Sequence, residues 1–184
     1  MQERRFYVNF RDIELTLLLL YLFFMSTIAM AFLSLAPWLP SRGKDMKRIF
    51  KLAGLKPGEV FYDLGCGEGK IVSCAAKQYE ARAIGIELAL PLYFICKIRQ
   101  LFNCKENITF KFKNLFKENL SRADVIYVFG MKGKLKNKLK PKLENELKKG
   151  ARVVSYSFPI EGWIPEIIDK PTKKDLTIYL YKIQ

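Results

Sequence analysis

The stretch Val60-Phe-Tyr-Asp-Leu-Gly-Cys-Gly-Glu-Gly-Lys70 decides the fold of this chain. An apolar run ends at Asp63, and a turn with glycines at Gly65, Gly67 and Gly69 leads directly into a helical pattern. Glycine permits a sharp turn and lets a ligand lie against the backbone. The N–H groups at the start of the helix favour an anionic group such as a carboxylate. A tight structural turn without a ligand is the alternative.

A second acidic residue, Glu87, follows at the end of the next apolar run. A carboxylate there can accept hydrogen bonds from both hydroxyls of a ribose. The dinucleotide fingerprint GxGxxG needs a small third residue, but counted from Gly65 that position is Lys70. The pattern is instead D-x-G-x-G-x-G, the first motif of class I methyltransferases. Asp63 can bind the ammonium of a methionine group, so the motif predicts S-adenosylmethionine as the cofactor.

Strands and helices alternate around this motif, which predicts an α/β sheet with helices on both faces. We expect strands at 59–63, 82–87, 108–112, 123–129 and 151–158, helices at 41–54, 70–78, 89–102 and 132–149, and an antiparallel edge strand at 175–182. The last of these helices carries a leucine at every fourth position among many lysines, as expected of an amphipathic helix that covers the sheet. A membrane-surface contact is the alternative. Pro141 should break this helix or begin a second one.

Residues near the predicted carboxyl ends of the strands complete the candidate site, because ligands in open α/β sheets bind there. Asn114 follows the third strand and could bond the adenine edge, or could be a helix N-cap. Tyr127 lies on the fourth strand, which Asp124 opens, and is either near the transferred methyl group or simply a buried strand residue. The neighbours of the motif residues, Cys66, Leu88 and Leu115, are added to the cofactor-binding set.

The N-terminal part of the chain contains a long uncharged segment, LTLLLLYLFFMSTIAMAFLSLA, from Leu15 to Ala36. As a helix it would be about 33 Å long, enough to cross a hydrocarbon core of about 30 Å. A core helix would show a polar stripe, and a signal peptide usually has a shorter apolar region. We therefore expect a flank at 1–12, a transmembrane helix at 13–39 and a methyltransferase domain at 40–184.

Charge and composition suggest the orientation of the apolar helix, the kind of partner and the chemistry that the chain lacks. More Lys and Arg residues follow the apolar segment than precede it, so the positive-inside rule places the domain in the cytoplasm as a single-pass membrane protein. The formal net charge of +14 suggests an acidic partner such as anionic lipids, or simply a solvated lysine-rich surface. The four cysteines form no CxxC pair and the chain has no histidine, so no metal site is expected and an imidazole base is excluded.

The motifs together resemble those of the small membrane-tethered protein-lysine N-methyltransferases, the family that modifies the ATP synthase c-subunit and the adenine nucleotide translocase. The resemblance covers roughly residues 40–165. It rests on LAGLKPGEVFYDLGCGEGKIVSCAAK, on AIGIEL, and on ADVIYVFG followed by LKPKLENELKKGARVVSYSFPIEGW. One departure is Pro40-Ser-Arg, where relatives often have a Pro-Thr-Pro-like element.

The resemblance implies cofactor contacts at Asp63, Gly65, Gly67, Glu87 and Asn114. It further implies that Asp124 and Tyr127 lie near the acceptor, which would be a lysine side chain of a protein such as a membrane protein. Three alternatives stay open: a methyltransferase for a small lipophilic molecule, an RNA methyltransferase, and a non-catalytic membrane adaptor. The fourth strand ends in YVFG, without the Asn/Asp-Pro-Pro-Tyr/Phe pattern that clamps a flipped base, so nucleic acid is disfavoured.

Overall fold

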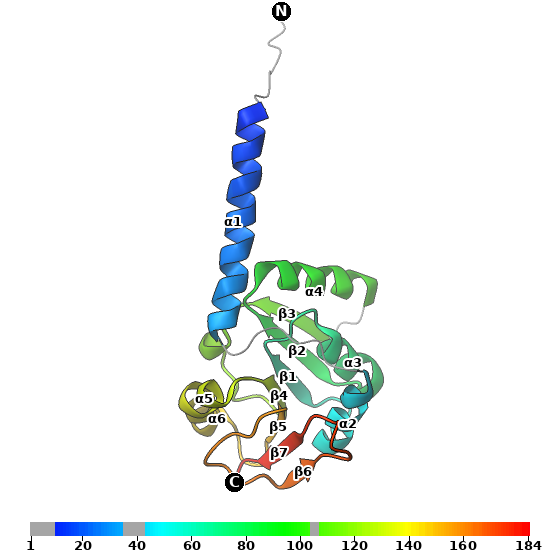
Figure 1. Ribbon diagram of the computed structural model, residues 1–184. Helices are drawn as coiled ribbons and strands as arrows, with labels where there is room; N and C mark the ends of the chain where they lie inside the picture. The colour runs from blue at the N-terminus through cyan, green and yellow to red at the C-terminus, as the bar shows by residue number, and fades with distance from the viewer. Residues whose placement is uncertain (1–9, 35–42, 104–106) are drawn as a thin grey trace, which may run out of the picture.

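A mixed sheet forms the centre of the domain, and the computed structural model describes residues 10–34, 43–103 and 107–184 (Figure 1). Within these residues the sheet has seven strands in the order β3-β2-β1-β4-β5-β7-β6. The strands are β1 Val60–Leu64, β2 Arg82–Glu87, β3 Ile108–Phe112, β4 Val125–Phe129, β5 Arg152–Tyr156, β6 Ile167–Asp169 and β7 Ile178–Lys182. The first five are parallel, and β7 pairs antiparallel with both β5 and β6.

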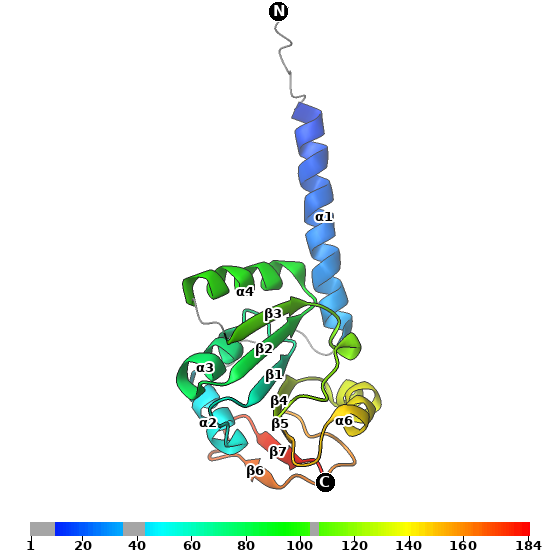
Figure 2. The ribbon, with the colours of Figure 1, turned by 180° about the vertical axis from the view of Figure 1, so that it is seen from behind.

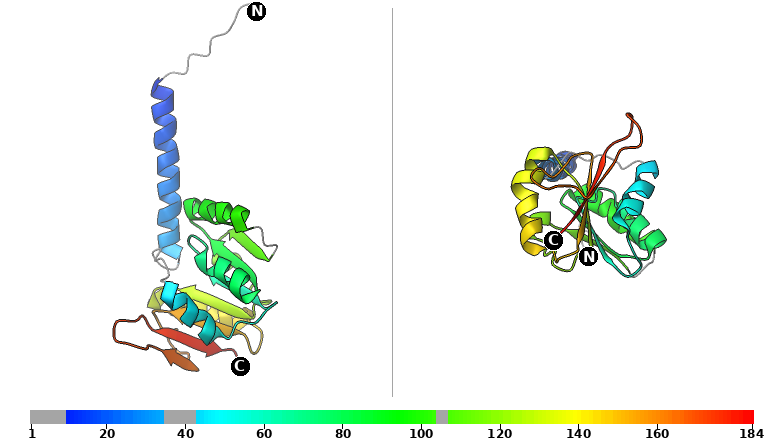
Figure 3. Two further views of the ribbon diagram at one scale, coloured as in Figure 1. Left: turned by 90° about the vertical axis from the view of Figure 1, so that its right-hand side faces the viewer. Right: turned by 90° about the horizontal axis from the view of Figure 1, so that it is seen from below.

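Helices cover the two faces of the sheet as separate layers (Figures 2 and 3). One layer holds α2 Gly43–Ala53, α3 Lys70–Tyr79 and α4 Leu90–Asn103. The other holds the run α5 Lys132–Lys134, a π-helical turn Leu135–Leu139 and α6 Lys140–Glu146. A 3-10 turn, Leu115–Lys117, connects β3 toward β4. Helices on both faces of a largely parallel sheet agree with the expected class I methyltransferase architecture.

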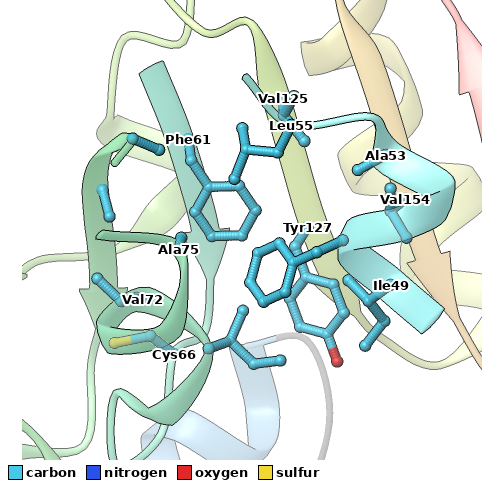
Figure 4. Close-up of a cluster of buried hydrophobic side chains, with 14 of the residues drawn as sticks. Ile49, Ala53, Leu55, Phe61, Cys66, Val72, Ala75, Val125, Tyr127 and Val154 are labelled. Carbon is cyan, nitrogen blue, oxygen red and sulfur yellow. The ribbon is translucent and has the colours of Figure 1, made fainter. Parts of the chain in front are cut away.

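Alternation along each strand divides the core into two clusters. Phe61, Val125 and Tyr127 face α2 and α3, as Figure 4 shows for the cluster around Ala75 and Leu55. Their neighbours in sequence face the opposite layer, where the leucines of the lysine-rich run are buried: Leu135, Leu139, Leu143 and Leu147. The prediction that this run covers the sheet is therefore confirmed.

Pro141 begins a second helix, one of the two outcomes expected for it. It lies in the first turn of α6, which follows the π-helical turn directly. The preceding turn, Leu135–Leu139, widens to π-helical geometry. The helical run ends at Glu146, short of the expected 149.

The C-terminal strands differ from the prediction. The alternating segment forms β7, which is antiparallel as expected, but it lies inside the sheet rather than at its edge. The edge is β6, a strand of three residues that pairs with β7 through Ile168 and Tyr179. It carries no alternating pattern of useful length, so its pairing with β7 stabilises it more than its own sequence does.

The N-terminal helix α1, Phe10–Ser34, projects away from the sheet and meets the domain at α4 (Figure 1). It is long and apolar enough to span a membrane over Phe10–Ala29. Residues 10–23 are all exposed, whereas Thr27 is buried. The expected flank before residue 10, the segment 35–39 and Pro40-Ser-Arg lie outside the described residues.

Candidate active site

The glycine turn joins the carboxyl end of β1 to the start of α3. The N–H groups of Gly65 and Cys66 both donate to the carbonyl oxygen of Ile86 at 3.0 Å, which fixes the turn against β2. Gly65, Gly67 and Gly69 all have positive φ values, which glycine adopts readily. No side chain caps α3, whose N-cap is Gly69. The backbone donors at the start of α3 therefore remain available to an anionic group.

Glu87 ends β2 and lies beside the turn. Its carboxylate accepts backbone N–H groups from Gly67 at 2.8 Å, Leu88 at 2.9 Å and Ala89 at 2.8 Å. Burial raises the pKa of Glu87, and these three hydrogen bonds oppose that rise. A carboxylate has about four acceptor positions, so Glu87 can still accept a hydroxyl while its own backbone holds it in place.

Asp63 is the most deeply buried acid at the site, with 2% of its surface exposed. Among residues 10–34, 43–103 and 107–184, no hydrogen bond or ion pair joins its carboxylate to another group. Burial raises the pKa of Asp63 well above its usual value, and the nearby negative charge of Glu87 raises it further. A buried carboxylate without a partner is suited to a cationic ligand group, because such a group would compensate for the lost hydration.

Two glycines allow the turn to pack closely, and only Gly69 belongs to the predicted motif. A Cβ at Gly69 would lie 2.6 Å from the Phe110 ring, and one at Gly85 would lie 2.8 Å from both Cys66 Sγ and the same ring. Gly85 stands inside β2, and a glycine in a strand indicates close packing from a neighbour. The strand RAIGIE carries this signal, although Gly85 was not among the predicted site residues.

Cys96 of α4 was also missed as a residue that supports the turn. Its Sγ donates to the carbonyl oxygen of Gly67 at 3.0 Å and lies 3.9 Å from Cys66 Sγ. Both cysteines are buried and free. The contact joins elements far apart in sequence, so no local pattern could have indicated it.

Asn114 and Leu115 follow β3 at the same edge of the sheet. Asn114 Oδ1 accepts the Phe116 N–H at 3.0 Å and caps the 3-10 turn, which is the structural alternative stated for it. Its amide nitrogen is not used in that cap. Leu115 is buried in the cluster beneath α6, with its side chain on the face opposite Asp63.

Tyr127 lies next to Asp63, because the two residues are register partners in the paired strands β1 and β4. Its side chain is buried in the same cluster as Ile49 and Val154, which lie on the same side of the cluster (Figure 4). Aromatic rings continue from it along the carboxyl edge: Tyr156 at 6.3 Å, then Phe129 and Phe158. The ring of Tyr127 thus belongs both to the core and to an aromatic wall beside the site.

Asp124 lies at the amino ends of the parallel strands, opposite the glycine turn, so its expected position near the acceptor was wrong. It stands before β4, where its carboxylate accepts the N–H of Val60 at 2.7 Å and pairs with Lys148. Because β1 and β4 are parallel, the residues that begin them meet at the amino edge, away from the glycine turn. Its contacts indicate a structural role.

The remaining predicted residues fit S-adenosylmethionine. Asp63 could hold the methionine ammonium, the start of α3 its carboxylate, and Glu87 the ribose hydroxyls. A Cβ added at Gly65 would meet no atom within 4 Å, so open space adjoins the turn. No cluster of metal-binding side chains is found among the described residues.

Known proteins share both the sequence and the fold. The ANTKMT methyltransferase domain matches residues 63–167. A protein-lysine N-methyltransferase from Saccharolobus islandicus is 35% identical over 163 residues, covering 84% of this chain and 98% of that protein. The human lysine N-methyltransferase of the ATP synthase c-subunit is 30% identical over 134 residues, and the match covers 71% of this chain and 55% of the human protein.

Solved structures show the same architecture. An RNA methyltransferase from Salinibacter ruber in complex with S-adenosyl-L-homocysteine has a TM-score of 0.74 and 29% identity. The alignment covers 79% of this chain and 94% of that one. A mutant of MtNAS bound to S-adenosylmethionine has a TM-score of 0.65 at 11% identity, covering 77% and 61% of the two chains, which supports the fold alone.

Proposed function

The chain belongs to the family defined by the ANTKMT methyltransferase domain, and from that premise we propose that it methylates a lysine side chain of a membrane protein. The observation that carries the proposal is the match to the archaeal protein-lysine N-methyltransferase over 98% of that protein's length. The vertebrate relatives are matched over little more than half of their length, so their named substrates indicate only the class of acceptor.

The chain is an S-adenosylmethionine-dependent methyltransferase. When bound, the cofactor supplies an activated methyl group on a positively charged sulfur. We propose that Asp63, Gly65, Cys66 and Gly67 hold its methionine part, that Glu87 and Leu88 hold the ribose, and that Asn114 and Leu115 border the adenine. Asp63 and Glu87 lie at the carboxyl ends of β1 and β2, and the other residues follow β1, β2 and β3, where parallel strands direct their carboxyl ends to one edge.

We propose that the acceptor lysine enters along the aromatic rings at the end of β4 and β5. A lysine amine must be neutral to attack, and a partly desolvated site near a positive charge favours the neutral form. Tyr127 stands beside Asp63 and would position the amine. Methyl transfer of this kind needs orientation more than acid–base chemistry, so a chain without histidine can carry it out.

Membrane anchoring is a further part of the proposal. Helix α1 is exposed over residues 10–23, whereas a helix from the core of a soluble protein would be largely covered. The excess of Lys and Arg after it favours a cytoplasmic domain. The enzyme would then reach lysines of membrane proteins at that surface.

The test is to incubate the detergent-solubilised protein with methyl-labelled S-adenosylmethionine and membranes that lack the enzyme, beside an Asp63→Ala variant. We expect label in a discrete protein band, recovered as methyl-lysine by mass spectrometry and absent with the variant. Label confined to the lipid extract would contradict the lysine proposal and indicate a small lipophilic acceptor. Tight cofactor binding without transfer to any fraction would indicate an adaptor.

RNA is the second candidate acceptor, because the Salinibacter protein is named an RNA methyltransferase and this chain is strongly basic. An excess of positive charge attracts RNA and anionic lipids alike. Adding total RNA from the same cells to the labelling reaction separates the two. Label that disappears with ribonuclease but not with protease would favour RNA over lysine.

A further inference from the structure

Helix α4 carries an apolar face that stays largely exposed among the described residues. Phe94, Ile95, Ile98 and Phe102 are 43–84% exposed, and they recur at the spacing of one helical face. At 3.6 residues per turn, they fall within an arc of about 100°. Lys97 and Arg99 lie on the two sides of this arc. We call the surface formed by Phe94, Ile95, Ile98 and Phe102 the α4 stripe.

The opposite face of α4 supports the glycine turn. Cys96 is fully buried and bonds the Gly67 carbonyl oxygen, and Arg99 Nε donates to the carbonyl oxygen of Glu68 at 2.8 Å. Gln100 donates to the carbonyl oxygen of Ile108 at 2.8 Å. These contacts attach α4 rigidly to the cofactor end of the sheet, so whatever binds the α4 stripe lies about one helix diameter, roughly 10 Å, from the turn.

The direction of α1 indicates what covers the stripe. Helix α1 meets α4 and projects away from the sheet, and α4 lies on the side of the domain toward which α1 projects (Figures 1 and 3). The face of α4 that carries Cys96 packs on the glycine turn, so the exposed α4 stripe faces away from the sheet, toward that side. A bilayer crossed by α1 would therefore lie parallel to α4 and against its exposed face. A helix of this kind, apolar outward with a cation (Lys97) beside the stripe, is typical of helices that lie in the membrane interface.

The length of α1 supports the same arrangement. Residues 10–23, which stand clear of the domain, span about 21 Å, less than a hydrocarbon core of about 30 Å. Sinking α4 by about 5–10 Å, as interfacial helices do, extends the embedded length of α1 to about 26–31 Å. Embedded to this depth, α1 places most of its candidate span, Phe10–Ala29, within the bilayer.

We propose that the α4 stripe inserts into the membrane interface beside α1 and fixes the catalytic domain upright on the bilayer. This deepens the proposed function and rests on its membrane anchoring, because the orientation requires α1 to span. Sheet edge β3 then faces the lipid and β6 faces away (Figure 1). With the glycine turn just below α4, the acceptors are lysines close to the headgroup level, not lysines on distant soluble domains.

Tryptophan reporters in the full chain test the proposal. Ile98→Trp places a probe on the α4 stripe, and Ile168→Trp places one on β6; the two isoleucines are 55% and 58% exposed, which makes them a matched pair. Each variant is reconstituted at one copy per nanodisc of phosphatidylcholine and phosphatidylglycerol, with or without bromine on the upper acyl chains. The parent protein supplies the background from its two natural tryptophans, and cofactor binding confirms the fold of each variant.

We expect bromolipid to quench the emission added by Ile98→Trp by at least about half and to leave that of Ile168→Trp unchanged. Equal quenching of the two probes, or none of either, would overturn the proposal. Blue-shifted but unquenched emission from Ile98→Trp that requires two copies per disc would also overturn it, because a second chain would then cover the stripe.

A third reporter separates this result from the anchoring on which it rests. Leu19→Trp lies within the candidate span of α1. If it is quenched while Ile98→Trp is not, α1 anchors the protein but α4 does not lie on the membrane, and only the present inference fails. If Leu19→Trp is itself unquenched, the anchoring proposed above fails, and the upright orientation fails with it.

Discussion

At the scale of single residues, Asp63 and Glu87 are two buried acids with different local support. Glu87 accepts three backbone N–H groups, whereas no hydrogen bond or ion pair among the described residues holds the carboxylate of Asp63. The ionised form of Asp63 is therefore unfavourable until a cation arrives. On its proposed role, Asp63 lowers the stability of the cofactor-free protein and provides a partner for the ammonium group of the cofactor.

Asp63→Asn should stabilise the cofactor-free protein at neutral pH and weaken its affinity for S-adenosylmethionine by at least about tenfold, because a charge-assisted hydrogen bond contributes about 1.5–3 kcal/mol. The pKa of Asp63 is raised on folding, so the protonated side chain contributes its full stabilisation below the ordinary pKa of aspartate. That effect is lost as pH rises through the folded pKa. Urea unfolding across this range and calorimetric titration with cofactor measure the two effects; a variant less stable at neutral pH would contradict the account.

Tyr127→Phe should lower the rate of methyl transfer by about tenfold or more while leaving the cofactor Kd unchanged. The ring is buried and its removal would open a cavity, so phenylalanine is the variant that preserves packing. Single-turnover kinetics and cofactor titration provide the check. An unchanged rate would assign Tyr127 to the core alone, the alternative that its burial also permits.

Asp124→Ala should cost about 1–3 kcal/mol of stability, because the half-buried N–H of Val60 loses its acceptor. Burial raises the pKa of Asp124, but hydrogen bonds from Lys148 and Val60 outweigh burial and lower it overall. A lowered pKa means that the stabilisation is present above the ordinary value and is lost as pH falls through the folded value. Denaturant unfolding at neutral and acidic pH measures this loss. Cofactor affinity should not change, and a large loss of affinity would return Asp124 to the site.

At the scale of elements, the glycine turn depends on its neighbours α4 and β2. Cys66, Cys96 and Phe110 pack around it with little space left, and Gly85 provides the room. A parallel sheet brings residues from the carboxyl ends of three strands close together. The distances between these residues depend on the side chains that pack beneath the loops.

Gly85→Ala should destabilise the protein by about 1–3 kcal/mol through overpacking, and it should also weaken cofactor binding. Its Cβ would lie 2.8 Å from Cys66 Sγ and 2.9 Å from Val72 Cγ2, so the turn itself must shift. Gly133→Ala is the control, because a Cβ there meets nothing within 4 Å. Thermal unfolding with and without cofactor separates the two effects. Equal behaviour of the two variants would show that the turn tolerates the added methyl group.

At the scale of the whole molecule, a projecting apolar helix contacts a domain with a seven-stranded sheet through α4 (Figure 3). The sheet extends from β3, next to α4, to β6 at the far end. Under the proposed anchoring, this arrangement would give the molecule a membrane side and a solvent side, whereas the net charge alone indicates only an acidic partner.

Leu19→Arg should reduce retention of the protein in membranes, since an arginine near the centre of a span costs about 2.5–3.5 kcal/mol. Alkaline carbonate extraction of expressing cells measures the retained fraction. Ile164→Arg, in a loop near β6 and 94% exposed, is the matched control and should remain membrane-bound. If Leu19→Arg is retained as fully as the control, α1 does not cross the bilayer.

Local patterns determined much of this protein from the sequence alone. The alternation of apolar runs, the glycine turn, the two acids and the long apolar segment each depend on neighbours within a few residues. They were sufficient for the α/β architecture with helices on both faces, the boundaries of β2 and β3, and the cofactor. Asn114 was identified with both of its possible roles, of which its cap is the one that the structure displays.

Features that depend on contacts between distant segments became evident only in the folded chain. Asp63 and Asp124 each adjoin an apolar strand, yet the parallel pairing of β1 and β4 sends one to the carboxyl edge and the other to the amino edge. β6 exists because β7 pairs with it, and Cys96 reaches Gly67 only once α4 packs on the sheet. The exposure of the α4 stripe can be known only from the folded positions of the elements that could cover it. Burial and pairing are properties of the assembled chain, so no local pattern could determine them.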